Sequence, residues 1–294
     1  MSILITGSIA YDHLLEYKGQ FSDVLIADKL QNLSVCFLAQ EKKICFGGCA
    51  GNIAYNLKLL KADFIVYGRA GKDFNEYEKH FKKLKIDTKY IQKITNKYTA
   101  TAYITTDING HQITTFAPGA MFDGSKISLT SISDKIDLAI IAPEDSHFMN
   151  QIYRECKKHK IPYVFDPGQQ LPIFDKKNLE EIINNAFITI VNDYEFELLA
   201  KILKIDKNYF LKNKKTLIIT KGEKGSELIT AGKEQKIKIF KPKKIVDPTG
   251  CGDAYRAGLL YGIANNWDLK KSCELGAKLA TKVIEKRGTQ EHKN

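Results

Sequence analysis

The chain has 294 residues, 44% of them hydrophobic, enough for one large α/β domain or two small ones, and no apolar run approaches the roughly 20 residues of a membrane span. Its net charge is +11, but only four of the 45 basic residues are Arg, the usual reader of base edges, and the Lys pairs are scattered. We therefore expect no nucleic-acid partner and no membrane partner. The absence of a signal-peptide pattern, and six cysteines without a C-x-x-C pair, lead us to expect a cytoplasmic protein.

The first predicted strand leads to a candidate ligand group. Residues 2–7 form an apolar run ending in Gly7, which predicts a buried strand, and Asp12 follows at its carboxyl end. In an open parallel sheet, ligands bind beyond the carboxyl ends of the strands, so Asp12 is a candidate acceptor of hydrogen bonds from a hydroxylated ligand. An ordinary turn Asp explains the position equally well.

Residues 13–45 interrupt the pattern and lead into a glycine-rich helix start. They contain no convincing helix, and residues 33–39 favour a strand, so we interpret 13–45 as an insertion that leaves the main sheet. Gly47 and Gly48 then remove side chains where a ligand must come close, and Asn52 lies near the start of a helix, able to donate and to accept hydrogen bonds. The alternative is a close contact between a helix and a strand.

A β-hairpin completes a predicted lid. Residues 98–106 and 112–116 alternate apolar and polar side chains around an Asn-Gly turn, which is a strong hairpin signal. We expect this hairpin to join the 13–45 insertion in one small sheet. Phe116 and Met121 are the apolar side chains where the chain returns to the main domain, and core packing is their alternative role.

The rest of the chain alternates between strands and helices. Strands are predicted at 63–68, 137–142, 161–166, 187–191 and 216–220, and helices at 74–84, 146–158, 177–185, 194–203, 251–265 and 268–286. This alternation predicts a three-layer, Rossmann-like α/β fold, in which a mostly parallel central sheet has helices on both faces. We assign residues 1–12, 46–97 and 118–294 to a large α/β domain, and residues 13–45 and 98–117 to the small β lid.

Polar groups follow three of these strands, at the edge where Asp12 is expected. Asn192 and Glu195 are three residues apart at a helix start and so share a face, which suits the outer shell of a Mg²⁺ that keeps its waters. A helix N-cap with a capping-box Glu explains the pair equally well. The loop 220–225 offers a hydroxyl and backbone N–H groups to a phosphate, or is an ordinary hairpin turn, and residues 165–169 follow the third strand.

The most specific chemistry lies in the stretch Asp247-Pro248-Thr249-Gly250-Cys251-Gly252-Asp253. It follows a segment predicted as a strand, 237–245, and it opens a helix. Glycines allow a sharp turn, and the N–H groups at a helix start have no intrahelical partners and bind anions, phosphate above all. An acidic side chain beside such a cradle makes sense as a base that takes the proton of an attacking hydroxyl, which makes Asp253 the candidate base. A turn with an N-cap is the alternative.

Together these segments resemble the ribokinase-like, or phosphofructokinase-B type, family of sugar and nucleoside kinases. The likeness covers nearly the whole chain, is closest to bacterial adenosine kinases, and rests on Gly47-Gly48 to Asn52, Asn192-x-x-Glu195, Thr220-Lys221-Gly222 and Asp247 to Asp253. Cys251 stands where the family usually has Ala. Its N–H is unaffected by that change, but an exposed thiol there would be sensitive to oxidation or alkylation.

The resemblance implies ATP-dependent phosphorylation of the 5′-hydroxyl of adenosine, giving AMP and ADP, with ATP and Mg²⁺ as cofactors and activation by K⁺ left open. Asp253 would be the base, and the N–H groups of Gly250, Cys251 and Gly252 would hold the transferring group. By the same resemblance, the residues that bind the acceptor are Asp12, Gly47, Gly48, Asn52 and Phe116. The residues that bind ATP are Asn192, Thr220, Gly222, Gly225 and Thr249. Asn192 and Glu195 would hold Mg²⁺ through water.

Two other functions stay open on the sequence. A sugar kinase of the same family would act on ribose or a related sugar, but the apolar lid residues Val35, Phe37, Phe116 and Met121 favour a base-bearing substrate. A nucleotide-binding regulator would have no need for the base Asp253. Exposed lid strands would also allow two chains to pair as a homodimer.

Overall fold

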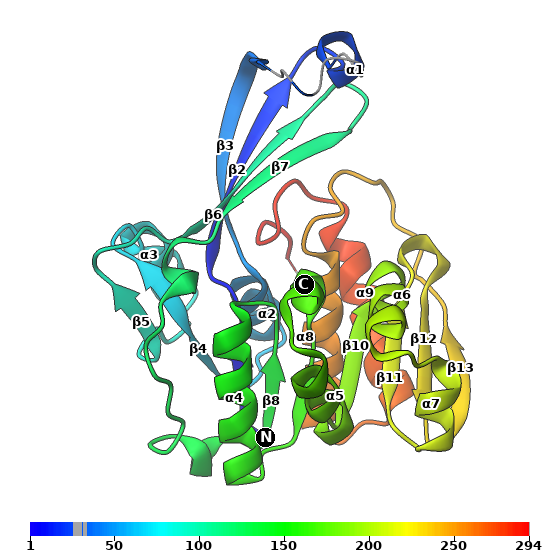
Figure 1. Ribbon diagram of the computed structural model, residues 1–294. Helices are drawn as coiled ribbons and strands as arrows, with labels where there is room; N and C mark the ends of the chain where they lie inside the picture. Colours follow the sequence, from blue (N-terminus) through cyan, green and yellow to red (C-terminus); the bar gives the residue numbers. More distant parts are fainter. Residues whose placement is uncertain (26–30, 32–33, 294) are drawn as a thin grey trace.

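The computed structural model describes residues 1–25, 31 and 34–293, and Figure 1 shows a large α/β body with a small sheet rising from one edge. The strands of the large sheet are β1 (Ile3–Thr6), β4 (Phe64–Gly71), β5 (Ile91–Ile94), β8 (Leu138–Ile141), β9 (Tyr163–Phe165), β10 (Ile188–Asn192), β11 (Leu217–Thr220), β12 (Ser226–Thr230) and β13 (Lys233–Ile237). Their order is β13-β12-β11-β10-β9-β8-β1-β4-β5. Neighbours from β5 to β11 run parallel, and β12 and β13 add antiparallel pairs at one edge.

Helices cover both faces of this sheet. They are α2 (Cys49–Leu59), α3 (Asn75–Lys83), α4 (Ser146–His159), α5 (Lys176–Asn185), α6 (Asp193–Leu203), α7 (Lys207–Lys212), α8 (Cys251–Ala264) and α9 (Leu269–Val283). Side chains alternate across the strands, so Ile3 and Ile5 of β1 pack with α2, α3, α8 and α9, whereas Leu4 packs with α4 to α7. Burial of both faces explains the continuous apolar runs of the parallel strands and confirms the three-layer prediction. Among the described residues, no helix has the length and apolar character needed to cross a membrane.

The second sheet is formed by β2 (Ala10–Tyr17), β3 (Ala39–Gly47), β6 (Ala100–Thr106) and β7 (Gln112–Ala117), in the order β3-β2-β6-β7. The hairpin of β6 and β7 turns at Gly110, which has a φ of +82°, as the Asn-Gly pair predicts. The short helix α1 (Phe21–Val24) lies at the far end of this small sheet (Figure 1). The sheet extends beyond the limits expected for the lid, because β2 begins at Ala10 and β3 continues to Gly47, which puts Asp12 on a lid strand.

Two strand predictions are wrong. In the predicted strand 33–39, residue 33 lies outside the described residues, residues 34–38 have no regular structure, and β3 begins only at Ala39. The predicted strand 237–245 is also absent, because β13 ends at Ile237 and the next residues form neither helix nor strand. Pro242 lies in that segment, and its missing N–H and the surrounding lysines explain why an apolar pattern does not become a paired strand there.

Candidate active site

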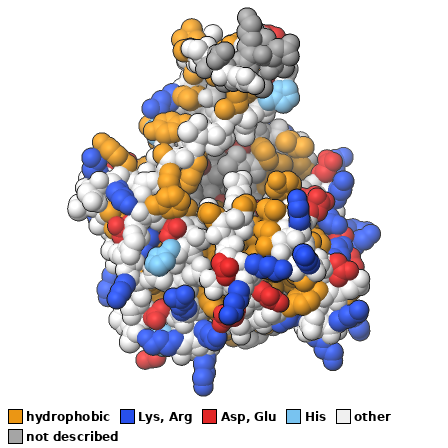
Figure 2. Space-filling view, viewed as in Figure 1, with side chains coloured by type: hydrophobic (Ala, Val, Ile, Leu, Met, Phe, Trp, Pro, Cys, Tyr) orange, Lys and Arg blue, Asp and Glu red, His pale blue; other side chains and the backbone are white. Residues whose placement is uncertain are grey.

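A cleft of about 620 Å³ lies at the carboxyl ends of the parallel strands and reaches the small sheet, a volume typical of small-molecule sites. Its lining residues are Ser8, Cys49, Phe116, Met121, Pro143, Asp166, Gly168, Gln169, Gln170, Asn192, Glu195, Thr220, Pro248, Gly250, Gly252, Asp253 and Arg256. Figure 2 shows hydrophobic side chains gathered around the junction between the small sheet and the large domain, and Lys and Arg interspersed with Asp and Glu over the large domain.

The anion cradle is predicted at the turn before α8, which is a tight turn into a helix start. Asp247 Oδ1 accepts a hydrogen bond from the backbone N–H of Thr249 at 2.9 Å, which tightens the turn. Gly250 is the N-cap of α8 with a φ of +79°, and a Cβ at this position would lie 2.8 Å from the Cβ of Thr289. Cys251 N–H donates to the carbonyl of Pro248 at 3.3 Å. Gly252 lines the cleft, and since α8 begins at Cys251 its N–H group has no carbonyl four residues back within the helix.

Asp253 lies on the first turn of α8 and lines the cleft. Its Oδ2 accepts a hydrogen bond from Asn52 Nδ2 at 2.8 Å. The pKa of Asp253 is raised to about 6, because burial and the charge of Asp166 raise it by more than the Asn52 hydrogen bond and the Arg256 charge lower it. Asp253 is therefore mostly ionised at neutral pH but more basic than an exposed Asp, as a general base requires.

Arg256 and Asp166 form a buried ion pair beside Asp253 that the sequence motifs did not reveal. Arg256 Nε and Nη2 both donate to the Asp166 carboxylate, the second at 2.7 Å, and Nη1 donates to the carbonyl of Gly252 at 3.1 Å. The position of Arg256, three residues after Asp253 on α8, was a signal that the two side chains share a face. Arg256 thus lies beside Asp253 with its positive charge paired to Asp166.

Asp12 lies on β2 and is buried, and Gly47 on the neighbouring strand β3 leaves room for its carboxylate, where a Cβ would collide with it. Burial raises the pKa of Asp12 to about 7, with further raising by the charges of Asp253 and Asp247. The structure thus brings Asp12 close enough to Asp253 for their charges to interact. Gly48 is the N-cap of α2, with a φ of +83°.

Asn52 lies on α2 and is only 4% exposed. Its Nδ2 faces Asp253, and its Oδ1 accepts hydrogen bonds from Thr289 Oγ1 at 2.7 Å and Gln290 Nε2 at 3.1 Å. Sequence reasoning named Asn52 but gave no role to Thr289 and Gln290, because the chain near residue 290 carries no motif of its own.

The predicted nucleotide residues divide into two groups. Asn192 and Glu195 line the cleft and form a capping box for α6, in which each side chain accepts a hydrogen bond from the other residue's N–H, at 2.7 and 2.8 Å. Thr220 also lines the cleft. Gly222 and Gly225 lie in the turn between β11 and β12, so the hairpin alternative describes that loop.

The side of the cleft near the small sheet is lined by two apolar side chains and by two side-chain amides. Phe116 of β7 is half-exposed and Met121, which follows it in a short 3-10 helix, is buried. Gln169 and Gln170 line the same cleft after β9. Gln170 Oε1 is buried and has no hydrogen-bond partner among the residues that the structure describes, which indicates a group that a ligand would satisfy.

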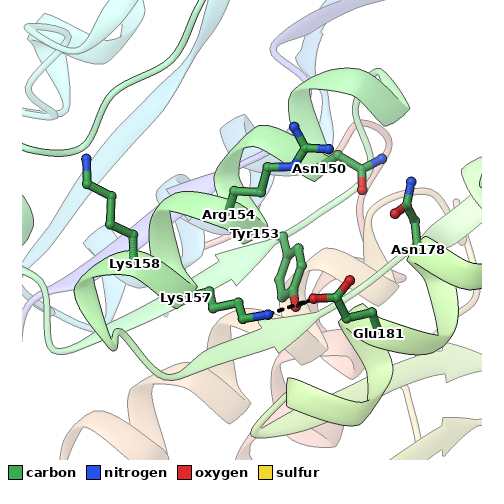
Figure 3. Close-up of a pocket in the computed structure, with 7 residues that line it drawn as sticks. All are labelled: Asn150, Tyr153, Arg154, Lys157, Lys158, Asn178 and Glu181. Carbon is green, nitrogen blue, oxygen red and sulfur yellow. Dashed lines mark hydrogen bonds and ion pairs between the residues drawn. The ribbon is translucent and has the colours of Figure 1, made fainter.

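A second, shallower hollow of about 290 Å³ lies between α4 and α5. Its side chains pair with one another, since Lys157 and the Tyr153 hydroxyl both contact Glu181 Oε1, at 2.7 and 2.8 Å (Figure 3). It lies on the outer side of these helices and holds none of the predicted site residues, so the candidate active site is the larger cleft.

A carboxylate base beside an anion-binding helix start, in a cleft at the carboxyl edge of a parallel sheet, defines a phosphotransferase that acts on an alcohol. Comparison with known proteins gives the family. Residues 25–294 match the model of the pfkB family of carbohydrate kinases, and the chain belongs to this ribokinase-like family.

Similar proteins narrow the class. The nucleoside kinase of Methanocaldococcus jannaschii is 34% identical over 247 residues, which cover 83% of this chain and 81% of that protein. The structure of the Burkholderia thailandensis nucleoside kinase in complex with inosine has a TM-score of 0.89 and 36% identity, and the match covers 99% of this chain and 93% of that one. The ribokinase of Bacillus subtilis is 24% identical over 91% of this chain and 90% of that protein. The chain is thus a ribokinase-family kinase related to nucleoside kinases and ribokinases.

Proposed function

We propose that the protein is a nucleoside kinase that transfers the γ-phosphoryl group of ATP to the 5′-hydroxyl of a purine nucleoside, with adenosine as the expected acceptor. The observation that carries this proposal is the position of Asp253: its carboxylate lies on the first turn of α8, accepts a hydrogen bond from Asn52 and lines a cleft with an apolar wall. The similarity to two nucleoside kinases, one of them seen in complex with inosine, supports it. Such an enzyme would return purine nucleosides to the nucleotide pool.

In this mechanism Asp253 accepts the proton of the 5′-hydroxyl as that oxygen attacks the phosphoryl group. The N–H group of Gly252 at the start of α8 and the guanidinium of Arg256 stabilise the negative charge on the transferring group. Asp12, buried on the lid strand β2, accepts hydrogen bonds from the ribose hydroxyls. We further propose that the small sheet closes over the acceptor and excludes water, which would otherwise compete for the phosphoryl group.

The charge of the cleft fits a divalent cation. Three of the carboxylates that line it belong to Asp166, Glu195 and Asp253, and one cation, Arg256, lies among these lining residues. Burial and the charge of Asp166 raise the pKa of Glu195, as expected for an acidic group short of positive partners. Asn192 and Glu195 line this cleft and would hold a Mg²⁺ that keeps its waters. When bound with ATP, Mg²⁺ would neutralise phosphate charge.

The wall beside the small sheet favours a nucleoside over a free sugar. Phe116 and Met121 offer apolar area for a purine ring, and the unpartnered Gln170 Oε1 offers it an acceptor. A free ribose would leave both apolar side chains facing a polar ligand. The similarity to a ribokinase keeps a sugar acceptor as the second candidate.

The test is ADP release from Mg-ATP with adenosine, inosine, guanosine, cytidine, ribose and fructose 6-phosphate as separate acceptors. Turnover with purine nucleosides, and adenosine fastest, is the expected result. Turnover with ribose or fructose 6-phosphate and not with nucleosides would contradict the proposal. In that case the apolar wall does not bind a base.

A further inference from the structure

Residues 288–292 form a mostly buried C-terminal segment that packs against the turn from Asp247 to Asp253, although the segment carries polar side chains. Thr289 and His292 are almost fully buried and Gln290 is 6% exposed. The segment is attached to the turn at Asp247, whose Oδ2 accepts a hydrogen bond from the N–H of Gly288 at 3.1 Å. Most buried polar side chains are hydrogen-bonded, and in this segment Thr289 and Gln290 both make such bonds to neighbouring side chains.

The segment completes a line of hydrogen bonds that ends on the base. His80 Nε2 lies 2.9 Å from Gln290 Oε1, and Gln290 Nε2 donates to Asn52 Oδ1 at 3.1 Å. Asn52 Nδ2 then donates to Asp253 Oδ2 at 2.8 Å. Every donor in this line points toward the carboxylate of Asp253.

The direction of the line is fixed by its surroundings. Gln290 Nε2 also donates to the hydroxyl of Tyr77 at 2.8 Å, and that hydroxyl donates to the carbonyl of Gly47 at 2.7 Å. If the Gln290 amide were reversed, its Oε1 would face Asn52 Oδ1 with no proton between them. A reversed Asn52 amide would in turn bring an oxygen against the Asp253 carboxylate. Thr289 Oγ1, 2.7 Å from Asn52 Oδ1, reinforces the observed orientation.

We propose that Gln290 and Thr289 are positioning residues for the phosphoryl-transfer reaction: they hold the Asn52 amide so that its N–H keeps the Asp253 carboxylate in place. The inference rests on the proposed role of Asp253 as base and extends it to the C-terminal segment. The Asp253 carboxylate accepts side-chain hydrogen bonds from Asn52 and Cys49, and loosening the Asn52 bond removes part of what orients the carboxylate and stabilises its charge.

The titratable and charged groups that interact with Asp253 are kept in the variants below. They are Asp12 on β2, Cys49 on α2, Tyr77 on α3, Asp166 after β9, and Cys251 and Arg256 on α8. A change in the pH dependence of a variant therefore reports on the hydrogen-bond line.

The experiment compares Gln290→Met with Tyr55→Phe. Met fills the volume of Gln290 without its hydrogen bonds. Tyr55→Phe removes a different anchor of the same segment, since the Tyr55 hydroxyl donates to the carbonyl of His292 at 2.6 Å and does not contact the line. For Gln290→Met we expect kcat at pH 7 to fall roughly tenfold and the acid limb of the pH profile of kcat to move up by about one pH unit. The KM for the nucleoside should stay within about twofold of the parent value. Tyr55→Phe should keep the parent kcat and pH profile.

A second pair keeps the test independent of folding defects. Thr289→Val should lower kcat in the same sense, and Thr289→Ser, which keeps the hydroxyl, should restore it. A parent-like acid limb in Gln290→Met, or an equal shift in Tyr55→Phe, would overturn the proposal, because the segment would then act only by its packing. If the parent enzyme phosphorylates ribose instead of nucleosides, the proposed function is wrong, and the same acid limbs measured with ribose still decide the positioning role.

Discussion

Replacement of Arg256 by Met should be the most destabilising single change in the cleft. Arg256 is 7% exposed and Asp166 is 1% exposed, and the guanidinium donates twice to that carboxylate. Its loss leaves Asp166 as a buried anion with Glu195 and Asp253 as acidic neighbours. Breaking a buried ion pair by removing one partner costs about 3–5 kcal/mol. That is a large part of a typical stability of about 5–15 kcal/mol, and it corresponds to a fall in Tm of roughly 10 °C.

Differential scanning calorimetry of a matched set tests this reasoning. Asp166→Asn should cost less than Arg256→Met, because Arg256 keeps the charges of Asp253 and Glu195 as partners. The double variant should be more stable than Arg256→Met alone, since neither buried charge is then left without its partner. A Tm of Arg256→Met equal to that of the parent, or a larger loss of Tm in Asp166→Asn than in Arg256→Met, would refute this prediction.

Other predictions follow from individual side chains. The pKa is raised to about 6 for Asp253 and to about 7 for Asp12, and both side chains are proposed to act as carboxylates. The value of kcat/KM should therefore fall as the pH drops through 7, and more steeply below 6. The Asp12→Asn variant should lose the step near pH 7, and a flat profile from pH 5 to 8 would count against both roles. Burial raises the pKa of Cys251 to about 12 and its thiol faces the carbonyl of Ala280, so iodoacetamide at neutral pH should spare the activity; inactivation that Cys251→Ala prevents would show a reactive thiol. Phe116→Ala should raise the KM for the nucleoside roughly tenfold while leaving the KM for ATP nearly unchanged, and an equal rise in both would remove Phe116 from the acceptor wall.

The fold was predictable where local pattern and long-range packing agree. The parallel strands of the large sheet are buried on both faces, so they appear as short apolar runs between helical periods, and β8 to β11 lie where those runs predict them. The failures share a cause. After β13 ends at Ile237, the apolar side chains of Ile239, Phe240 and Ile245 are exposed, and an alternating pattern without a strand partner does not form a strand.

The candidate site was predictable where glycines and acidic residues are close in sequence. The turn from Asp247 to Asp253 and the α2 start at Gly48 both form as expected, because positive φ angles and a helix start are local properties. The contacts that tune the base are not local. Asp166 and Arg256 are 90 positions apart, and Gln290 and Asn52 are 238 apart, so only the folded chain brings them together.

The central claim, that Asp253 is the base of an ATP-dependent nucleoside kinase, is tested most directly by measuring AMP and ADP formation from adenosine and Mg-ATP with the parent and Asp253→Asn enzymes. The Asn side chain can keep the hydrogen bond from Asn52 but cannot accept the hydroxyl proton. Our account predicts that kcat falls about 10²–10⁴-fold while ATP binding is retained. A variant that forms AMP at close to the parent kcat would contradict the account.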